Sequence, residues 1–180
     1  GDNGYAVDIE KLYDNVMNRY KYGGLDTPGL YLDETTLRTC YYHRRLFAQL
    51  AKELIKQGDH VRARKVLTYA EQAVPAYNVP EIYESGSFDI ATAYAALGEK
   101  TKAVTLFNHL IAESEDYINW AFSLGNGRTG MMQNDCLYKF WQWNAYNERM
   151  KEIDKESYEA SNRRFEEKYA LFTQIINNRN

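Results

Sequence analysis

The chain has 180 residues, 44% of them hydrophobic, and its 22 Lys and Arg against 25 Asp and Glu give a net charge of −3. This composition is too apolar for a disordered chain and too balanced in charge for a basic nucleic-acid-binding arm. The sequence has no apolar run of about 18 residues, so we predict that this segment does not span a membrane. The length fits one domain or a short stack of repeats, and Tyr is unusually frequent, with 16 residues.

Apolar residues recur along the chain at the three- and four-residue spacing of helices, whereas the period of two that is typical of strands is scarce. Phe47, Leu50 and Leu54 form one such helical stripe. Residues 21–32 contain two glycine-rich turn signals and are predicted to form a loop. We therefore predict an all-α fold. The predicted helices span residues 8–19, 33–57, 59–73, 87–97, 100–114, 131–151 and 155–177, with a further segment up to Leu124.

Several helix ends are marked by residues that cap or interrupt helices. Asp33 is predicted to cap the N-terminus of the second helix, Gly58 to end that helix and Asp59 to cap the next one. Pro75 and Pro80 predict an irregular linker between helices, because proline disrupts the helical hydrogen-bond ladder.

Two helix–turn–helix segments superpose when Gly58 is aligned with Gly98, which gives a period of 40 residues. The alignment matches Ala51 with Ala91, Ala63 with Ala103, Leu54 with Tyr94 and Leu67 with Phe107. Antiparallel helices joined by a tight turn need small residues where they cross, and the alanines supply them. One such pair cannot bury its own apolar face, so neighbouring pairs stack, and a repeat of this length in an all-α chain indicates a solenoid.

Both copies resemble the tetratricopeptide repeat, whose pattern is W-x₂-L-G-x₂-Y, then A-x₃-F, then P. The first copy reads Phe47, Leu50, Ala51, Leu54, Ala63, Leu67 and Pro75. The second copy departs from the pattern, with Ser87 at the large aromatic position and Glu115 in place of the proline. The period of 40 residues is longer than the usual length of about 34 residues in tetratricopeptide repeats, and the extra residues lie in the linker at residues 76–86.

The predicted architecture is a set of antiparallel helix pairs stacked as a short tetratricopeptide-like α/α superhelix with capping helices. An N-terminal helix and loop occupy residues 1–32, and two tetratricopeptide-like pairs occupy residues 33–115. Long C-terminal helices at residues 116–180 belong to the same domain.

A second resemblance rests on the order of amino acids in four segments, which are Gly29–Glu34, Arg44–Ala51, Val74–Pro75 and Asn78–Pro80. These segments are similar to the C-terminal soluble tail of large bacterial polytopic membrane proteins of unknown function that are related to protein O-mannosyltransferases. The resemblance covers residues 25–125. It implies that this chain is an appendage of a glycosyltransferase-like membrane body and lies on the extracytoplasmic side. The resemblance assigns no catalytic residue to this chain.

The segment Gly125–Gly130 matches G-x-G-x-x-G, which binds dinucleotides when it follows a strand and opens a helix. No preceding strand is evident, so we predict a flexible turn between helices. The sequence also predicts no cofactor.

The two cysteines, Cys40 and Cys136, are not arranged as C-x-x-C, so no closed zinc site or dithiol motif is predicted. Cys40 and His43 are three residues apart, with Tyr42 beside them, and they are the basis of an alternative interpretation as a small helical enzyme. Lone helix histidines are more often surface or core residues. The leading prediction therefore names no catalytic residue and no metal ligand.

Arg45, Lys52 and Lys56 fall on one stripe of a helix, which in a tetratricopeptide-like stack faces the concave groove. Phe88 and Thr92 occupy the corresponding stripe of the next repeat. These five residues are the predicted partner-binding groove, and its cations suit an acidic peptide or another protein. The alternative is a solvated polar helix face.

Tyr138, Trp141 and Trp143 are a candidate aromatic surface, because Tyr and Trp combine a large apolar area with a polar tip. Packing between helices explains the same spacing. The leading hypothesis is a non-catalytic protein-interaction domain without nucleic-acid binding, whose partner is another protein or the membrane-embedded part of its own parent chain. An accessory carbohydrate-binding module is the alternative that uses these aromatic side chains.

Overall fold

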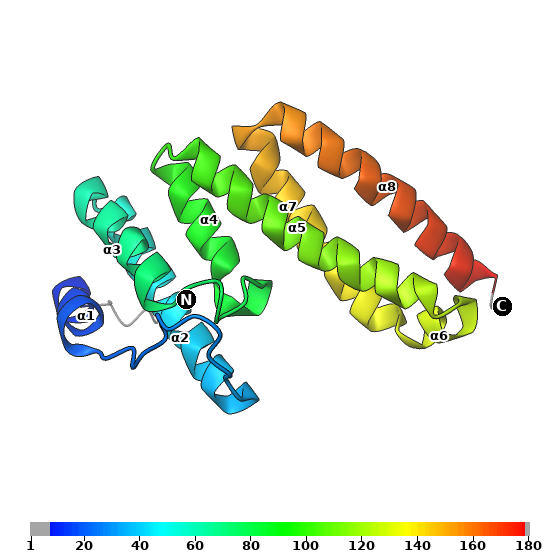
Figure 1. The fold of residues 1–180 in the computed structure, drawn as a ribbon. Helices are drawn as coiled ribbons and strands as arrows, with labels where there is room; N and C mark the ends of the chain where they lie inside the picture. Colours follow the sequence, from blue (N-terminus) through cyan, green and yellow to red (C-terminus); the bar gives the residue numbers. More distant parts are fainter. Residues whose placement is uncertain (1–7, 179–180) are drawn as a thin grey trace, which may run out of the picture. The chain divides into compact units, whose positions relative to one another are not determined.

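The computed structural model describes residues 8–178, so the beginning of the predicted N-terminal segment lies outside the described residues. Helices are the regular structure of this part of the chain, and it contains no strand, which confirms the all-α prediction (Figure 1). The chain divides into two units, the first ending at Glu99 and the second beginning at Lys100.

The first unit is built around its longest helix, α2, which packs against α1, α3 and α4. Its elements are α1 (Ile9–Asp14), the π-helix η1 (Asn15–Arg19), α2 (Glu34–Lys56), α3 (His60–Ala73), the 3₁₀ turn η2 (Tyr83–Ser85) and α4 (Ser87–Ala96). The predicted first helix therefore changes its hydrogen-bond pattern at Asn15 instead of continuing as one α-helix.

The caps predicted for α2 and α3 are confirmed. The Asp33 carboxylate accepts a hydrogen bond from the amide of Thr36 at 3.1 Å, and the Asp59 carboxylate accepts one from the amide of Arg62 at 3.0 Å. Gly58 has φ +80°, a conformation that costs glycine little, and it ends α2. These local signals are sufficient to set the boundary between the two helices.

The α2–α3 pair has a closely packed apolar core. Ala51 and Ala63, the residues predicted for the crossing, are both fully buried, together with Phe47, Leu50, Leu54, Val66 and Leu67. In the second predicted pair, Ala91 and Ala103 are also buried. The helices that carry them, α4 and α5, belong to different units.

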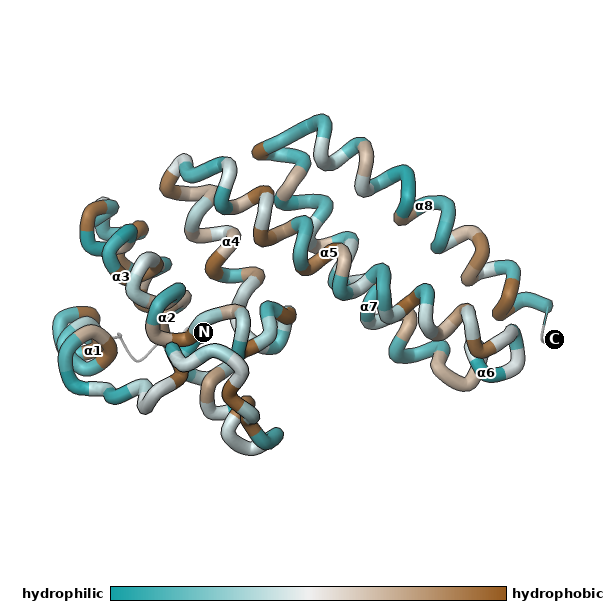
Figure 2. Tube along the Cα trace, in the orientation of Figure 1, coloured by the Kyte–Doolittle hydropathy of each residue, from teal (hydrophilic) through white to brown (hydrophobic). Residues whose placement is uncertain are grey.

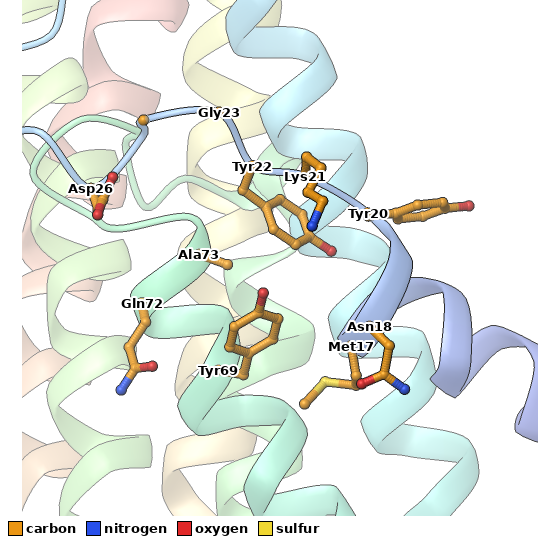
Figure 3. A pocket seen from close by; sticks show the side chains of 11 residues that line it. Met17, Asn18, Tyr20, Lys21, Tyr22, Gly23, Asp26, Tyr69, Gln72 and Ala73 are labelled. Carbon is orange, nitrogen blue, oxygen red and sulfur yellow. The ribbon is translucent and has the colours of Figure 1, made fainter.

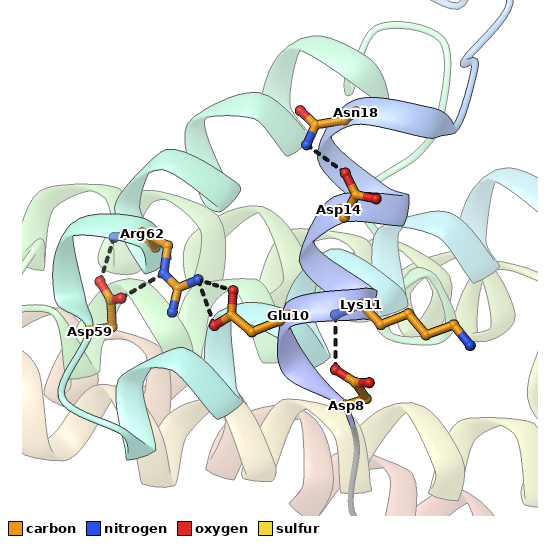
Figure 4. Close-up of polar contacts among 7 residues, drawn as sticks. All are labelled: Asp8, Glu10, Lys11, Asp14, Asn18, Asp59 and Arg62. Atoms are coloured by element: carbon orange, nitrogen blue, oxygen red, sulfur yellow. Dashed lines mark hydrogen bonds and ion pairs between the residues drawn. The ribbon is translucent and has the colours of Figure 1, made fainter.

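An ion pair joins α1 to α3. The guanidinium of Arg62 donates to both carboxylate oxygens of Glu10 at 2.8 Å and to Asp59 at 2.6 Å (Figure 4). The same guanidinium lies 5.3 Å from the centre of the Tyr13 ring. These contacts hold the short N-terminal helix against α3.

The proline-containing linker between α3 and α4 is held by a buried arginine. Arg44 is 5% exposed, and its guanidinium donates four hydrogen bonds to the linker. The acceptors are the carbonyls of Val74 (3.0 Å), Val79 (2.7 Å) and Pro80 (2.7 Å) and the hydroxyl of Ser85 (2.9 Å). Burial lowers the pKa of Arg44 to about 10, which leaves it charged at neutral pH.

Asn78 ties the same linker to the predicted loop at residues 21–32. Its amide nitrogen donates to the carbonyls of Leu25 (2.7 Å) and Thr27 (2.6 Å), and its amide oxygen accepts from the Leu30 N–H at 3.2 Å. Two irregular segments far apart in sequence therefore hold one another against the helices.

The second unit contains α5 (Lys100–Ser123), α6 (Asn126–Met131), α7 (Gln133–Ile153) and α8 (Lys155–Asn177). Helix α7 packs against both α5 and α8. Hydrophobic and hydrophilic residues alternate along α5 and α8, as is typical of helices with one buried face (Figure 2).

Two sequence predictions in this unit differ from the structure. Helix α5 continues from Lys100 to Ser123 without the predicted break after residue 114, because no glycine or proline interrupts it. The glycine-rich segment, predicted as a flexible turn, contains the short helix α6, which follows Gly125 at φ +85°. It is not the strand-to-helix turn of a dinucleotide site.

The core of this unit is rich in aromatic residues. Trp143 is fully buried, and its indole N–H donates to the Ser161 hydroxyl at 2.8 Å, which in turn donates to the Asn147 amide oxygen at 2.6 Å. The Phe140 ring contacts the rings of Phe165 and Phe172 of α8, with 5.6 and 5.4 Å between the ring centres. These contacts join α7 to α8.

Candidate functional site

The predicted basic stripe lies on the surface of α2, but two of its three cations have partners within the first unit. The Arg45 guanidinium donates to the Glu84 carbonyl, and the Lys56 ammonium lies 2.7 Å from the Glu53 carboxylate. Lys52 is exposed. An acidic ligand would therefore have to replace existing contacts of Arg45 and Lys56, which weakens the case for an anion-binding groove.

The two α4 residues assigned to the groove are half-buried. The Phe88 ring lies 5.6 Å from the Tyr83 ring, and the Thr92 hydroxyl donates to the Phe88 carbonyl at 2.9 Å. Both residues thus have contacts within their own unit, and their role in partner binding stays a prediction.

The residues of the alternative enzyme interpretation do not form a hydrogen-bonded set. Cys40 is buried, and burial raises the pKa of its thiol, which disfavours the reactive thiolate. The His43 ring contacts the rings of Tyr20, Tyr22 and Tyr42 at 5.7, 5.4 and 6.0 Å, all in edge-to-face geometry. Burial lowers the pKa of His43. Between the described atoms of Cys40 and His43 there is no hydrogen bond.

A hollow of about 350 Å³ lies beside this aromatic cluster, between η1, the following loop and α3 (Figure 3). Tyr22 and Tyr69 form part of its wall, and their rings are 6.0 Å apart. The Tyr22 hydroxyl is not available to a ligand as a donor, because it donates to the Val16 carbonyl at 2.9 Å. The other lining residues are Met17, Asn18, Tyr20, Lys21, Gly23, Gly24, Asp26, Gln72 and Ala73.

Two of the three members of the candidate aromatic surface on α7 are exposed, and their role in binding stays a prediction. Tyr138 and Trp141 are 44% and 52% exposed, and their rings stack at 5.7 Å with an angle of 10° between the planes. Trp143 was wrongly included, since it is buried against α8. Residues 141 and 143 are two positions apart on a helix and therefore point about 200° apart around its axis.

A second aromatic surface, which was not predicted from the sequence, lies on α5. Trp120 is 50% exposed, and its ring lies 5.4 Å from that of Tyr117. Both rings line an open hollow of about 570 Å³ on one face of the helix. The hollow is lined by His109, Ala112, Glu113, Asp116, Tyr117 and Trp120.

The two carboxylates that line the α5 hollow, Glu113 and Asp116, differ in their ion-pair partners. The Lys139 ammonium, from α7, lies 2.8 and 2.9 Å from the two Glu113 oxygens and 5.7 Å from the centre of the Tyr117 ring. Asp116 is exposed, with no ion pair to any residue in the range 8–178. The sequence signal for this site is the spacing of four between each carboxylate and its aromatic neighbour, Glu113 to Tyr117 and Asp116 to Trp120.

Neither a metal site nor a membrane helix is found in the described part of the chain. No group of three His, Cys, Asp or Glu side chains among residues 8–178 has the geometry to hold a metal ion. None of the described helices combines the length and the apolar character that crossing a membrane requires.

The chain matches no known protein-family model, and no curated protein and no solved structure is significantly similar to it. The resemblances to tetratricopeptide repeats and to the tail of a membrane protein therefore stay predictions.

Proposed function

We propose that this chain is a non-catalytic helical domain that binds a partner protein, and that the α5 hollow is the main contact. The observation that carries the proposal is Trp120, a large aromatic side chain that is half-exposed beside Tyr117 over an open hollow. Trp and Tyr are enriched among residues that dominate binding energy at protein interfaces. Helical packing holds both side chains on one face of a long helix, which limits the entropy lost on binding.

The resemblance to the tail of membrane proteins supports a specific partner. On that basis, the partner is the membrane-embedded body of the same parent chain, and the binding takes place on the extracytoplasmic side. The tetratricopeptide-like pattern is in keeping with this role, since stacked helix pairs present extended binding surfaces.

Site-specific photocrosslinking tests the proposal. A photoreactive phenylalanine analogue replaces Trp120, and in a matched control it replaces Arg163, an exposed residue of α8. The proposal expects crosslinked peptides, found by mass spectrometry after proteolysis of the parent chain from cells, that join position 120 to the membrane-embedded body, and few that involve position 163. Equal yields at the two positions, or no crosslink at position 120, would contradict the proposed contact.

Carbohydrate binding is the second candidate function, and it is favoured by the Tyr138–Trp141 pair. The two half-exposed rings stack on one another, and the ring faces that point away from this stack are of the kind on which a sugar ring can stack. Titration with a panel of glycans, followed by calorimetry, tests this candidate. Binding that is lost in Trp141→Ala and retained in Trp120→Ala would favour it over the protein-binding function.

A further inference from the structure

Helix α5 carries two copies of one kind of side-chain pair, a carboxylate followed four residues later by an aromatic ring. Glu113 and Tyr117 form the first copy, and Asp116 and Trp120 form the second, each with the carboxylate four residues before the aromatic ring. Residues four apart lie next to one another on a helix, so in each copy the carboxylate and the aromatic side chain are neighbours on the helix surface. Both copies line the same hollow.

The first copy is occupied by a cation from the protein itself. The Lys139 ammonium contacts both Glu113 oxygens within 2.9 Å and lies 5.7 Å from the centre of the Tyr117 ring. A carboxylate supplies charge attraction and hydrogen-bond acceptors, and an aromatic ring attracts a cation through its negative face. The molecule thus already shows that this arrangement of side chains binds an ammonium group.

The second copy has the same groups but no such cation in the described chain. Asp116 forms no ion pair with residues 8–178, and half of the Trp120 surface is open to solvent. Tryptophan is the aromatic side chain that attracts cations most strongly. The hollow of about 570 Å³ leaves room for a long side chain above the two residues.

We propose that Asp116 and Trp120 bind a lysine or arginine side chain presented by a basic segment of the partner protein. This inference rests on the proposed protein-binding function and adds the chemistry of the partner. An acidic segment is disfavoured at this position, since the Asp116 carboxylate is negatively charged and forms no ion pair with residues 8–178. A guanidinium group can donate to Asp116 while its plane stacks on the indole ring, so arginine is the better occupant.

NMR spectroscopy of the three indole N–H signals tests the inference with defined probes. A capped tetra-arginine peptide is titrated into the protein, and a capped tetra-glutamate peptide is the control for nonspecific effects. We expect the Trp120 signal to shift with tetra-arginine while that of the buried Trp143 stays constant. A Trp120 signal that does not move, or that moves equally with tetra-glutamate, would overturn the proposal.

Two variants separate the site from general charge attraction. Asp116→Asn removes the proposed contact, and Glu148→Gln removes the same charge from another exposed position, on α7. We expect roughly three- to fivefold weaker tetra-arginine binding in Asp116→Asn, as for the loss of an exposed ion pair while the Trp120 contact remains, and little change in Glu148→Gln. Equal weakening in the two variants would contradict a specific site.

A third variant tests the first pair, Glu113 and Tyr117, which the Lys139 ammonium occupies. Lys139→Met removes the internal ammonium and opens Glu113 and Tyr117 to the peptide, so tetra-arginine should bind more tightly than to the original chain. Unchanged or weaker binding, with the helical circular dichroism signal retained, would contradict the equivalence of the two copies.

The crosslinking experiment distinguishes this inference from the proposed function. A partner that crosslinks at position 120 but binds Asp116→Asn as well as the original chain would sustain protein binding and refute the basic segment. Absence of crosslinking together with absence of peptide binding would refute both.

Discussion

The buried guanidinium of Arg44 donates a 2.7 Å hydrogen bond to the carbonyl of Val79, 35 residues further along the chain. This bond is one of four that Arg44 makes to the linker between α3 and α4. Arg44, Val79 and Asn78 all belong to the segments on which the membrane-protein resemblance rests. In this chain, those residues have a structural role, because they position two irregular segments on the first unit.

Replacing Arg44 with Met should destabilise the first unit by about 3 kcal/mol, because the buried linker carbonyls lose their donors. Arg45→Met is the matched control, since this neighbour is exposed and makes one backbone contact, and its effect should stay within about 1 kcal/mol. Urea unfolding measures both changes. A loss for Arg44→Met no larger than that of the control would contradict the assigned role.

Replacing Asn78 with Ala should release the loop that precedes α2. We expect a loss of about 1–2 kcal/mol, since three hydrogen bonds disappear at a partly buried site. Hydrogen exchange provides the local readout, because the Leu30 amide loses its acceptor and should exchange faster. Asn108→Ala, at an exposed position of α5, is the control. Unchanged exchange at Leu30 would show that the loop is held by other contacts.

Local signals predicted much of the fold, and long-range contacts account for what they missed. Asp33, Gly58 and Asp59 act within a few residues of their own positions, so their capping roles were evident in the sequence. The partners of Arg44 lie 30 to 41 residues away and are mostly backbone carbonyls, which no side-chain pattern reveals. The π-helix at Asn15–Arg19 likewise had no recognisable sequence signal.

Replacing the buried Trp143 with Phe should destabilise the second unit by about 2 kcal/mol, since the core loses volume and the indole donor to Ser161. Trp141→Phe, at an exposed position, should be nearly neutral. Thermal unfolding followed by circular dichroism compares the two variants. Equal losses would contradict the different burial of these neighbouring tryptophans.

The surroundings of His43 predict a stability that falls under mild acid. Burial among Tyr20, Tyr22 and Tyr42 lowers the pKa of His43 below its ordinary value, so the unfolded chain takes up a proton at a higher pH than the folded one. The stability contribution of His43 is therefore complete above the unfolded pKa of about 6.5 and is lost as the pH falls through the lower, folded pKa.

Melting temperatures at pH 7.5 and 5.5 measure this dependence. The original chain should lose more stability between these pH values than His43→Phe, which keeps an aromatic ring and cannot be protonated. His60→Gln, at an exposed position, is the control and should behave like the original chain. Identical pH dependence in His43→Phe and the original chain would refute this assignment.

The candidate site was less predictable than the fold, and specific residues show why. The basic stripe was visible as a spacing, but the sequence did not show that Arg45 and Lys56 have partners of their own. Trp143 could have been separated from Trp141 by helical geometry alone. The two carboxylate–aromatic pairs of α5 were also visible as spacings of four, but their significance depended on Lys139, which reaches the first pair from another helix.

Calorimetry with the crosslinked partner region, produced as a separate protein, compares the α5 hollow with the basic stripe of α2. The chain with Trp120→Leu is measured beside the chain in which Arg45, Lys52 and Lys56 are all replaced by Ala. We predict that the Trp120→Leu chain binds at least tenfold more weakly, the effect of losing a dominant interface residue, and that the triple variant binds as the original chain does. Full affinity in the Trp120→Leu chain together with lost binding in the triple variant would refute the α5 contact and assign binding to the basic stripe of α2.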